Sequence, residues 1–360
     1  MNIKRLFLQL LIAGLLIIPT GAMAAESADK QPLMIEEQGS FAVGGKVITT
    51  PGTFDPMNPL PPDGQTFHGD HAYVFYQKPV NARKYPLIFL HGHAQFTKTW
   101  ETTVDGREGF QNIFLRRGFP VYLVDQPRRG NAGKSTVAMN LEPTAEEQRW
   151  FGQFRLGHWP NYHPGVQFPQ DKESLNQFFR QVTPNTGPYD AEVISDPMAA
   201  LFEKVGDSVF ILHSQAGGPG WLTAMKTDKV KGIVAYETGS GSVFPKGELP
   251  DPIQTNYGPV TGVEVPMEDF LKLTKIPILI VYGDFIPDKP VQHPGDDLWR
   301  GLKIITEKWV ETINRHGGDA KFVYLPDIGI KGNTHFPFSD LNNMEIADHL
   351  SAWLKEKKLD

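Results

Sequence analysis

Residues 209–218 read Val209-Phe210-Ile211-Leu212-His213-Ser214-Gln215-Ala216-Gly217-Gly218. This run predicts a buried strand, a tight turn that carries a serine, and the start of a helix, because its first four residues are apolar and β-prone. It has the layout of a nucleophile elbow, in which a strained turn presents a serine hydroxyl above a sheet. Ser214 is therefore a candidate nucleophile. The backbone N–H of Gln215, near a helix N-terminus, is a candidate oxyanion donor.

The elbow departs from the pattern G-x-S-x-G. Leu212 and Ala216 occupy the two glycine positions, and Gly217 comes one residue late. A strand followed by serine and glycine is common without catalysis, so this stretch alone is a weak signal. The rest of the chain must supply a base, an acid and a second oxyanion donor in a consistent order.

Composition excludes several classes of function. The 360 residues are 40% hydrophobic and 21% charged, with a formal net charge of −6, as is ordinary for a globular protein. The sequence contains no basic stripe that would suggest nucleic-acid binding. It also contains no polybasic run that would suggest binding to an anionic membrane surface. The absence of cysteine excludes disulfides, cysteine nucleophiles and thiolate metal sites.

The N-terminus predicts a signal peptide over residues 1–24. Lys4 and Arg5 precede the apolar run Leu6–Ile18, and Ala22-Met23-Ala24 is a small-x-small cleavage site. A membrane anchor is the alternative, but the apolar run is shorter than the roughly 20 residues that a span needs. We therefore expect a mature chain that starts at Ala25, is periplasmic or secreted, and keeps no stable membrane anchor after cleavage.

The mature chain, residues 25–360, alternates strand and helix patterns. Residues 25–40 are polar and predicted to be loosely held, and residues 50–69 are predicted to be a loop. Apolar strands are then expected at 85–90, 120–124, 208–213, 232–236, 277–282 and 321–325, with helical segments between them. This rhythm predicts a mostly parallel sheet with helices on both faces, whose ligands bind at the C-terminal ends of the strands.

An insertion at about 142–190 interrupts this rhythm. It is rich in aromatic residues, among them Trp150, Phe151, Phe154 and Trp159. An insertion before the nucleophile strand is a common place for a cap, and aromatic residues there would shape an apolar pocket and exclude water. The alternative is an extra helical layer that packs on the core without touching substrate.

Polar candidates follow successive predicted strands. Ser214 is followed by Glu237 after the next strand, by Asp284 after the one beyond, and by His335 in the loop after the last strand. This is the order Ser…acid…His of α/β-hydrolases. Histidine can take the serine proton and return it to the leaving group, and a carboxylate orients the imidazole. Asp284 occupies the commoner acid position in this fold, whereas Glu237 is an alternative within reach of the same histidine.

The loop His91-Gly92-His93-Ala94-Gln95 follows the first apolar strand, where α/β-hydrolases place the second oxyanion donor. We expect the backbone N–H of His93 or Ala94 to be this second oxyanion donor. The rival interpretation makes His91 and His93 metal ligands, with His68 and His71. No matching set of ligands follows the other strands, so neither a metal nor another cofactor is expected.

Several blocks resemble a small bacterial esterase family of the α/β-hydrolase superfamily whose elbow reads S-H-S-Q-S-G. The resemblance runs from about Ile88 to Trp353. The matching blocks are His91-Gly92, Trp100-Glu101-Thr102-Thr103, Asp105-Gly106-Arg107, Phe114-Leu115-Arg116-Arg117-Gly118, Asp125-Gln126, Arg129-Gly130, His213-Ser214-Gln215-Ala216-Gly217, Gly332-Asn333-Thr334-His335, Asn342-Asn343 and Ala347-Asp348. The departures are Leu212 and Ala216 in the elbow, the sequence of the oxyanion loop, and the composition of the cap.

The resemblance implies a serine esterase with Ser214 as nucleophile, His335 as base and Glu237 as acid, and it favours Glu237 over Asp284. We therefore expect a secreted hydrolase of small-molecule carboxylic esters that forms an acyl-enzyme. The same triad could act on a lactone, an amide or a polyester. A protein of a different class, a catalytically silent secreted binding protein on this fold, is the remaining alternative, although no member of the triad is missing.

Overall fold

The computed structural model describes residues 31–239 and 241–360. The predicted signal peptide, residues 1–24, and the expected start at Ala25 lie outside this part. All the elements below belong to one compact unit, Met34–Asp360. Within the described residues, no helix combines the length and the apolar character that crossing a bilayer requires.

The strands are β1 (Ile35–Val43), β2 (Lys46–Thr49), β3 (Thr66–Gly69), β4 (Ala72–Pro79), β5 (Leu87–Leu90), β6 (Val121–Asp125), β7 (Gly157–His158), β8 (Asn161–Tyr162), β9 (Ser208–His213), β10 (Val230–Tyr236), β11 (Val243–Pro245), β12 (Val263–Val265), β13 (Pro277–Tyr282) and β14 (Asp319–Tyr324). The α-helices are α1 (Phe110–Arg116), α2 (Glu147–Gln153), α3 (Lys172–Arg180), α4 (Ala191–Val205), α5 (Gly217–Lys226), α6 (Met267–Leu273), α7 (Pro294–Arg315) and α8 (Asn343–Glu356). Four short 3-10 helices are η1 (Thr97–Trp100), η2 (Gly130–Ala132), η3 (Ser214–Ala216) and η4 (Leu325–Ile328).

Eight strands form the central sheet in the order β1-β4-β6-β5-β9-β10-β13-β14. The pairs β1–β4 and β4–β6 are antiparallel, and every later pair is parallel. The prediction of a mostly parallel sheet is therefore confirmed. The strand β9, which precedes Ser214, lies between β5 and β10, so the loops that follow these three strands meet at one edge of the sheet.

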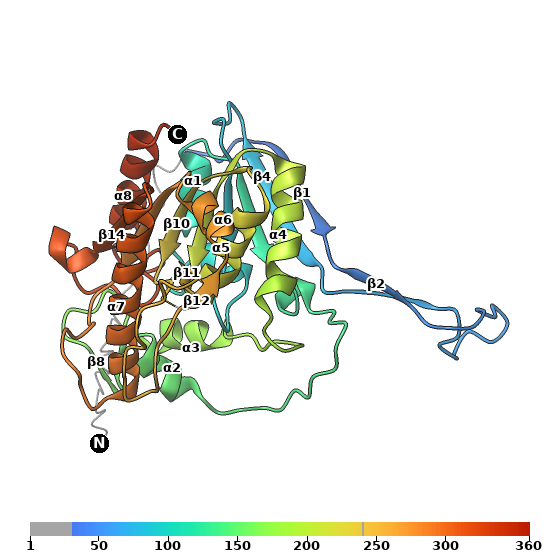
Figure 1. Cartoon of the computed structure of the whole chain (residues 1–360), viewed down its shortest axis with the longest axis horizontal. Helices are drawn as coiled ribbons and strands as arrows, with labels where there is room; N and C mark the ends of the chain where they lie inside the picture. Colours follow the sequence, from blue (N-terminus) through green and yellow to red (C-terminus); the bar gives the residue numbers. More distant parts are fainter. Residues whose placement is uncertain (1–30, 240) are drawn as a thin grey trace, which may run out of the picture. The chain divides into compact units, whose positions relative to one another are not determined.

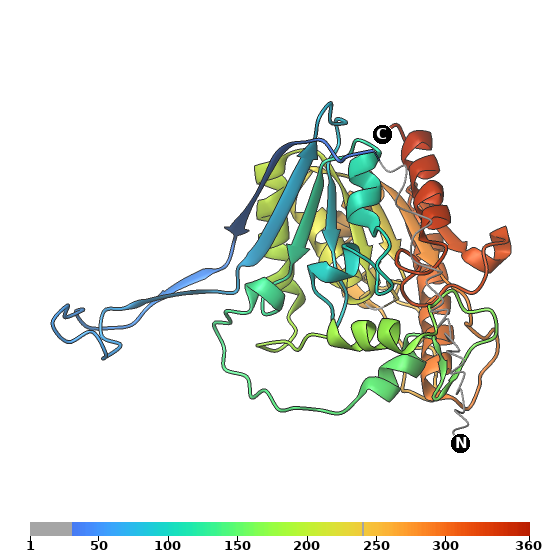
Figure 2. The same ribbon diagram turned by 180° about the vertical axis from the view of Figure 1, so that it is seen from behind.

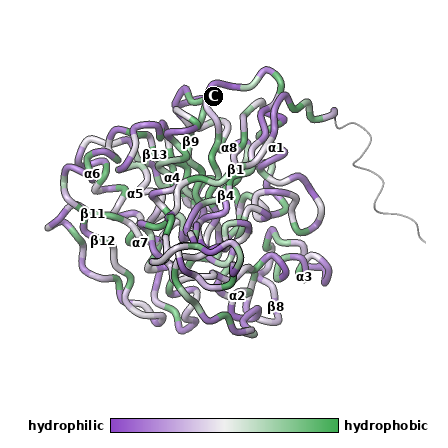
Figure 3. Tube along the Cα trace, turned by 90° about the vertical axis from the view of Figure 1, so that its right-hand side faces the viewer, coloured by the Kyte–Doolittle hydropathy of each residue, from purple (hydrophilic) through white to green (hydrophobic). Residues whose placement is uncertain are grey.

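Helices cover both faces of this sheet (Figures 1 and 2). The helices α4, α5 and α6 pack in sequence on one face, and Figure 2 shows α1 and α8 on the other. Hydrophobic residues run through the middle, along the strands (Figure 3). Residues 209–212 of β9 are fully buried, as expected for a strand covered on both sides.

Two expectations for the N-terminal part were wrong. Residues 35–40, expected to be loosely held, belong to β1, and residues 66–69, expected in a loop, form β3. Both segments are largely exposed, so they lack the alternation of apolar and polar residues that predicts a strand. The β2–β3 ribbon extends away from the sheet, carrying the loop 50–65 at its tip (Figure 1).

The inserted segment 142–190 contains α2, the small β7–β8 hairpin and α3. It contacts α7: the Trp299 indole N–H donates to the carbonyl of Gln153 at 2.6 Å, and α2 packs against α7. The segment therefore lies beside the helix that follows β13, near the edge of the sheet where β9 and β10 end.

Candidate active site

Ser214 sits in the strained turn that the sequence predicts between β9 and α5. Its φ is 54°, in the left-handed region that side-chain-bearing residues rarely adopt. Ser214 and Gln215 are partly exposed, whereas the flanking His213 and Ala216 are buried. One glycine in the following helix makes the turn possible, because a Cβ on Gly220 would lie 2.3 Å from the Leu212 Cδ1. The turn thus leaves Ser214 partly accessible at the end of β9.

The loop after β5 lies directly against this elbow. A Cβ on Gly92 would lie 2.6 Å from the Cβ of Ser214, so only glycine permits the approach. Arg129, buried beneath the loop, donates to the Gly92 carbonyl at 2.6 Å. Within the described chain, the amides of His93 and Ala94 donate to no protein acceptor, which leaves both available to a ligand.

The two histidines of this loop have different surroundings. His91 is fully buried, and its ring lies within hydrogen-bond distance of the Gln126 amide groups and the Gly92 carbonyl. His93 is exposed and faces Trp150 across a ring-centroid distance of 5.3 Å. The rival metal interpretation gains no support from their placement, because among the described residues neither ring belongs to a group of three close candidate ligands.

His335 and Glu237 lie together. The His335 Nδ1 is 3.3 Å from the Glu237 Oε2, and both side chains are buried. Since the carboxylate can only accept, Nδ1 carries the proton and Nε2 keeps a lone pair. Glu237 itself follows β10 with a φ of 59°, so its backbone is strained like that of Ser214.

Asp284 is placed differently. Its two carboxylate oxygens accept the backbone N–H groups of Phe285 at 2.6 Å and Gly332 at 2.8 Å. These contacts hold the turn after β13 and the loop that leads to His335. Asp284 therefore binds loop backbone, while the carboxylate that faces the imidazole belongs to Glu237.

His213, which precedes the serine, connects the elbow to the histidine loop. Its ring Nε2–H donates to the His335 carbonyl at 2.9 Å, and the two rings lie 4.6 Å apart. Burial lowers the pKa of His213 well below its ordinary value, so the ring is neutral. Within the described residues the Ser214 hydroxyl makes no direct hydrogen bond to His335; such contacts are often loose before substrate binds.

Arg155 is a site residue that sequence reasoning missed. Its Nη2 donates to the Glu237 Oε1 at 2.7 Å, its Nε donates to the Asp284 carbonyl at 2.8 Å, and its guanidinium lies over the Trp299 ring at 4.6 Å. The side chain is fully buried. A single arginine within an aromatic-rich insertion offers no periodic signal, so only the packing of segment 142–190 on the sheet edge brings it to Glu237.

The imidazole of His335 lies between aromatic rings. Phe154 stacks on it at 5.1 Å with an interplanar angle of 9°, and Trp299 lies 4.5 Å away. Burial, followed by the positive charge of Arg155, lowers the pKa of His335 well below its usual range. The ring is therefore neutral at physiological pH, which is the form of imidazole that can accept a proton.

A cavity of about 560 Å³ lies next to the loop 91–95 that follows β5. Its lining includes His93 and Ala94 from that loop, Leu141, and the side chains of Trp150, Phe179 and Val182 from segment 142–190. The insertion and the loop 91–95 thus share one cavity, whose wall combines aromatic, aliphatic and polar side chains.

Comparisons with known proteins agree with this architecture. The probable secreted lipase phiG of Fungal sp. (strain ATCC 74256) is 28% identical over 337 residues, which cover 82% of this chain and 88% of that protein. A novel bacterial esterase solved at atomic resolution superposes with a TM-score of 0.71 and 27% identity, over 92% of this chain and 99% of its own. No protein-family model matches the chain. With the strand order above, the similarity confirms the predicted α/β-hydrolase fold.

Proposed function

We propose that this chain is a secreted serine hydrolase of carboxylic esters, in which Ser214, His335 and Glu237 form the catalytic triad. The observation that carries the proposal is the buried His335–Glu237 contact of 3.3 Å, on loops beside a serine held in a strained elbow. The ester substrate class rests on the similarity to an esterase and to a secreted lipase. The signal-peptide pattern supports secretion.

In the first half-reaction the Ser214 oxygen attacks the ester carbonyl while the His335 Nε2 takes the hydroxyl proton. Glu237 accepts the Nδ1–H throughout and stabilises the imidazolium that forms. The tetrahedral oxyanion is bound by the Gln215 N–H and by the amide of His93 or Ala94, which the approach of Gly92 brings to the elbow. His335 then protonates the departing alcohol, leaving an acyl-enzyme.

In the second half-reaction water attacks the acyl carbonyl while His335 takes a proton from the water. His335 then returns this proton to the Ser214 oxygen as the acyl–oxygen bond breaks, which releases the carboxylic acid and restores the serine. Segment 142–190 acts as the cap: Phe154 covers the imidazole, and Trp150, Phe179 and Val182 line the cavity beside the oxyanion loop. An apolar acyl or alcohol group fits such a wall. The sequence blocks that resemble the S-H-S-Q-S-G esterase family support the same roles for Ser214, His335 and Glu237.

A fluorophosphonate probe and a panel of p-nitrophenyl esters test this function. The purified mature chain should be labelled on Ser214 and should hydrolyse at least one ester with serine-dependent turnover. Labelling with turnover only on a lactone, an amide or a polyester would keep the triad and change the substrate class. A folded chain that neither labels nor turns over any of these substrates would favour the silent binding protein.

The pH profile should reflect the lowered pKa of His335. The base must be neutral, so activity is lost as pH falls through this pKa, and the acid limb of kcat/KM should lie below pH 6.5. Arg155→Met should move the limb to higher pH, because it removes a positive charge that disfavours the imidazolium. Arg155→Lys should move it less.

Arg180→Met is the matched control for this experiment, since Arg180 lies on α3 in the same segment and is exposed. Its profile should coincide with that of the unaltered chain. An acid limb at or above pH 6.5, unmoved by Arg155→Met, would contradict the role given to burial and to Arg155.

A further inference from the structure

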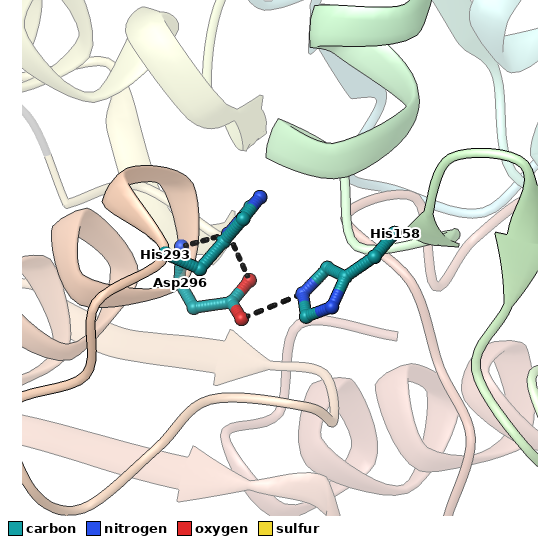
Figure 4. Close-up of side chains that lie close together, drawn as sticks. All are labelled: His158, His293 and Asp296. Atoms are coloured by element: carbon teal, nitrogen blue, oxygen red, sulfur yellow. Dashed lines mark hydrogen bonds and ion pairs between the residues drawn. The ribbon is translucent and has the colours of Figure 1, made fainter.

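Three side chains outside the triad converge where the inserted segment meets α7. His158 comes from β7, His293 is the N-cap of α7, and Asp296 lies in the first turn of that helix. Their candidate ligand atoms all lie within 4.8 Å of one another. Figure 4 shows the Asp296 carboxylate between the two imidazoles. Residues far apart in the sequence thus place two nitrogen donors and a carboxylate at one point.

The carboxylate of Asp296 contacts both rings. Its Oδ2 lies 2.8 Å from the His158 Nε2, and its Oδ1 lies 3.1 Å from the His293 Nδ1. Two ligands of tetrahedral zinc with bonds of about 2.0 Å are separated by roughly 3.3 Å. The two histidine–carboxylate pairs therefore already have nearly the spacing that an ion would require, and the two histidine nitrogens lie within 4.8 Å of each other.

One oxygen of this carboxylate has no donor. The Asp296 Oδ1 is buried without a hydrogen-bond partner, although it lies close to the His293 Nδ1. That nitrogen accepts the Asp296 backbone N–H at 3.2 Å, so its one lone pair is engaged there, and the ring must turn away from this N–H to bind an ion. The Asp296 Oδ1 therefore receives no proton from this ring, and a cation bound at that oxygen would supply the partner it lacks.

A further imidazole beside the cluster also has an unused nitrogen. The His163 ring lies 5.2 Å from that of His158, and its Nε2 is buried without a hydrogen-bond partner. Two or more imidazoles with one carboxylate select a borderline transition metal such as Zn²⁺ over Ca²⁺ or Mg²⁺, which prefer oxygen ligands.

We propose that His158, His293 and Asp296 bind one Zn²⁺ ion that clamps the inserted segment to α7. Three protein ligands leave a fourth position for water. The ion would stabilise the same junction between the inserted segment and α7 in which Trp299 contacts Gln153. Trp299 also packs against the His335 ring. The ion takes no part in the serine chemistry, so its expected effect is on stability.

Isothermal titration of the untagged, EDTA-treated mature chain with Zn²⁺ tests the site. We expect one equivalent to bind, and Zn²⁺ at about 100 times its Kd to raise Tm by roughly 3–4 °C. Binding should weaken at acidic pH because protons compete for the imidazoles. His158→Ala should lower the affinity by more than about tenfold; this side chain is half exposed, so the variant should fold.

The matched control is His316→Ala, which removes a histidine–carboxylate pair at the other end of α7, where His316 contacts Glu248 at 3.0 Å. It should bind Zn²⁺ like the unaltered chain. No stoichiometric binding, or equal affinity in the unaltered chain and His158→Ala, would overturn the proposal and leave a hydrogen-bonded histidine–aspartate cluster.

Discussion

Ser214→Ala is expected to lower kcat for ester hydrolysis by roughly 10⁴- to 10⁶-fold, because the acyl-enzyme can no longer form. Residual activity should come from the oxyanion donors and from substrate binding alone. The Cβ is retained in the strained turn, so the fold and Tm should change little. Steady-state kinetics with a p-nitrophenyl ester, together with thermal unfolding, measure both quantities.

Ser208→Ala is the matched control for this variant. Ser208 is a buried serine at the opposite end of β9, and its hydroxyl donates to the Gly206 carbonyl at 2.9 Å. Its loss should cost about 1 kcal/mol of stability and leave kcat near that of the unaltered chain. Wild-type turnover by Ser214→Ala would refute the proposed mechanism.

Glu237→Gln is expected to lower kcat by about 10³- to 10⁴-fold, since the amide cannot stabilise the imidazolium and can favour the wrong tautomer. Asp284→Asn should change kcat less than about tenfold, because Asp284 accepts only loop N–H groups. Parallel kinetics of the two variants compare carboxylates that both follow strands of the same sheet. A larger loss in Asp284→Asn would assign the acid to Asp284.

Glu237→Gln also leaves the buried guanidinium of Arg155 without its carboxylate, so Tm should fall. The double variant Glu237→Gln with Arg155→Met separates this structural effect from catalysis. Removing both charges should recover part of the lost stability, whereas kcat should stay low. Recovery of kcat along with stability would mean that Glu237 acts only through the fold.

Local patterns in the sequence were sufficient for the sheet and the elbow. The apolar runs that become β5, β6, β9, β10 and β13 are continuous, because these strands are buried on both faces. Each run is only a few residues long, so a short stretch of sequence is enough to identify it. The positions of Ser214 and His335 after strands followed from the same reading. Residues 35–40 of β1 and the exposed strand β3 left no such pattern, and they were not predicted to be strands.

Contacts between distant segments required the tertiary structure. The residues alone left both Glu237 and Asp284 open, with Asp284 in the commoner acid position, until a family resemblance favoured Glu237. Which of them faces the imidazole depends on how the loops after β10, β13 and β14 pack together. Arg155 reaches Glu237 from 82 positions away, and His158 meets Asp296 across 138. Sequence periodicity reports which side of an element is buried; it carries no information about which distant side chain lies there.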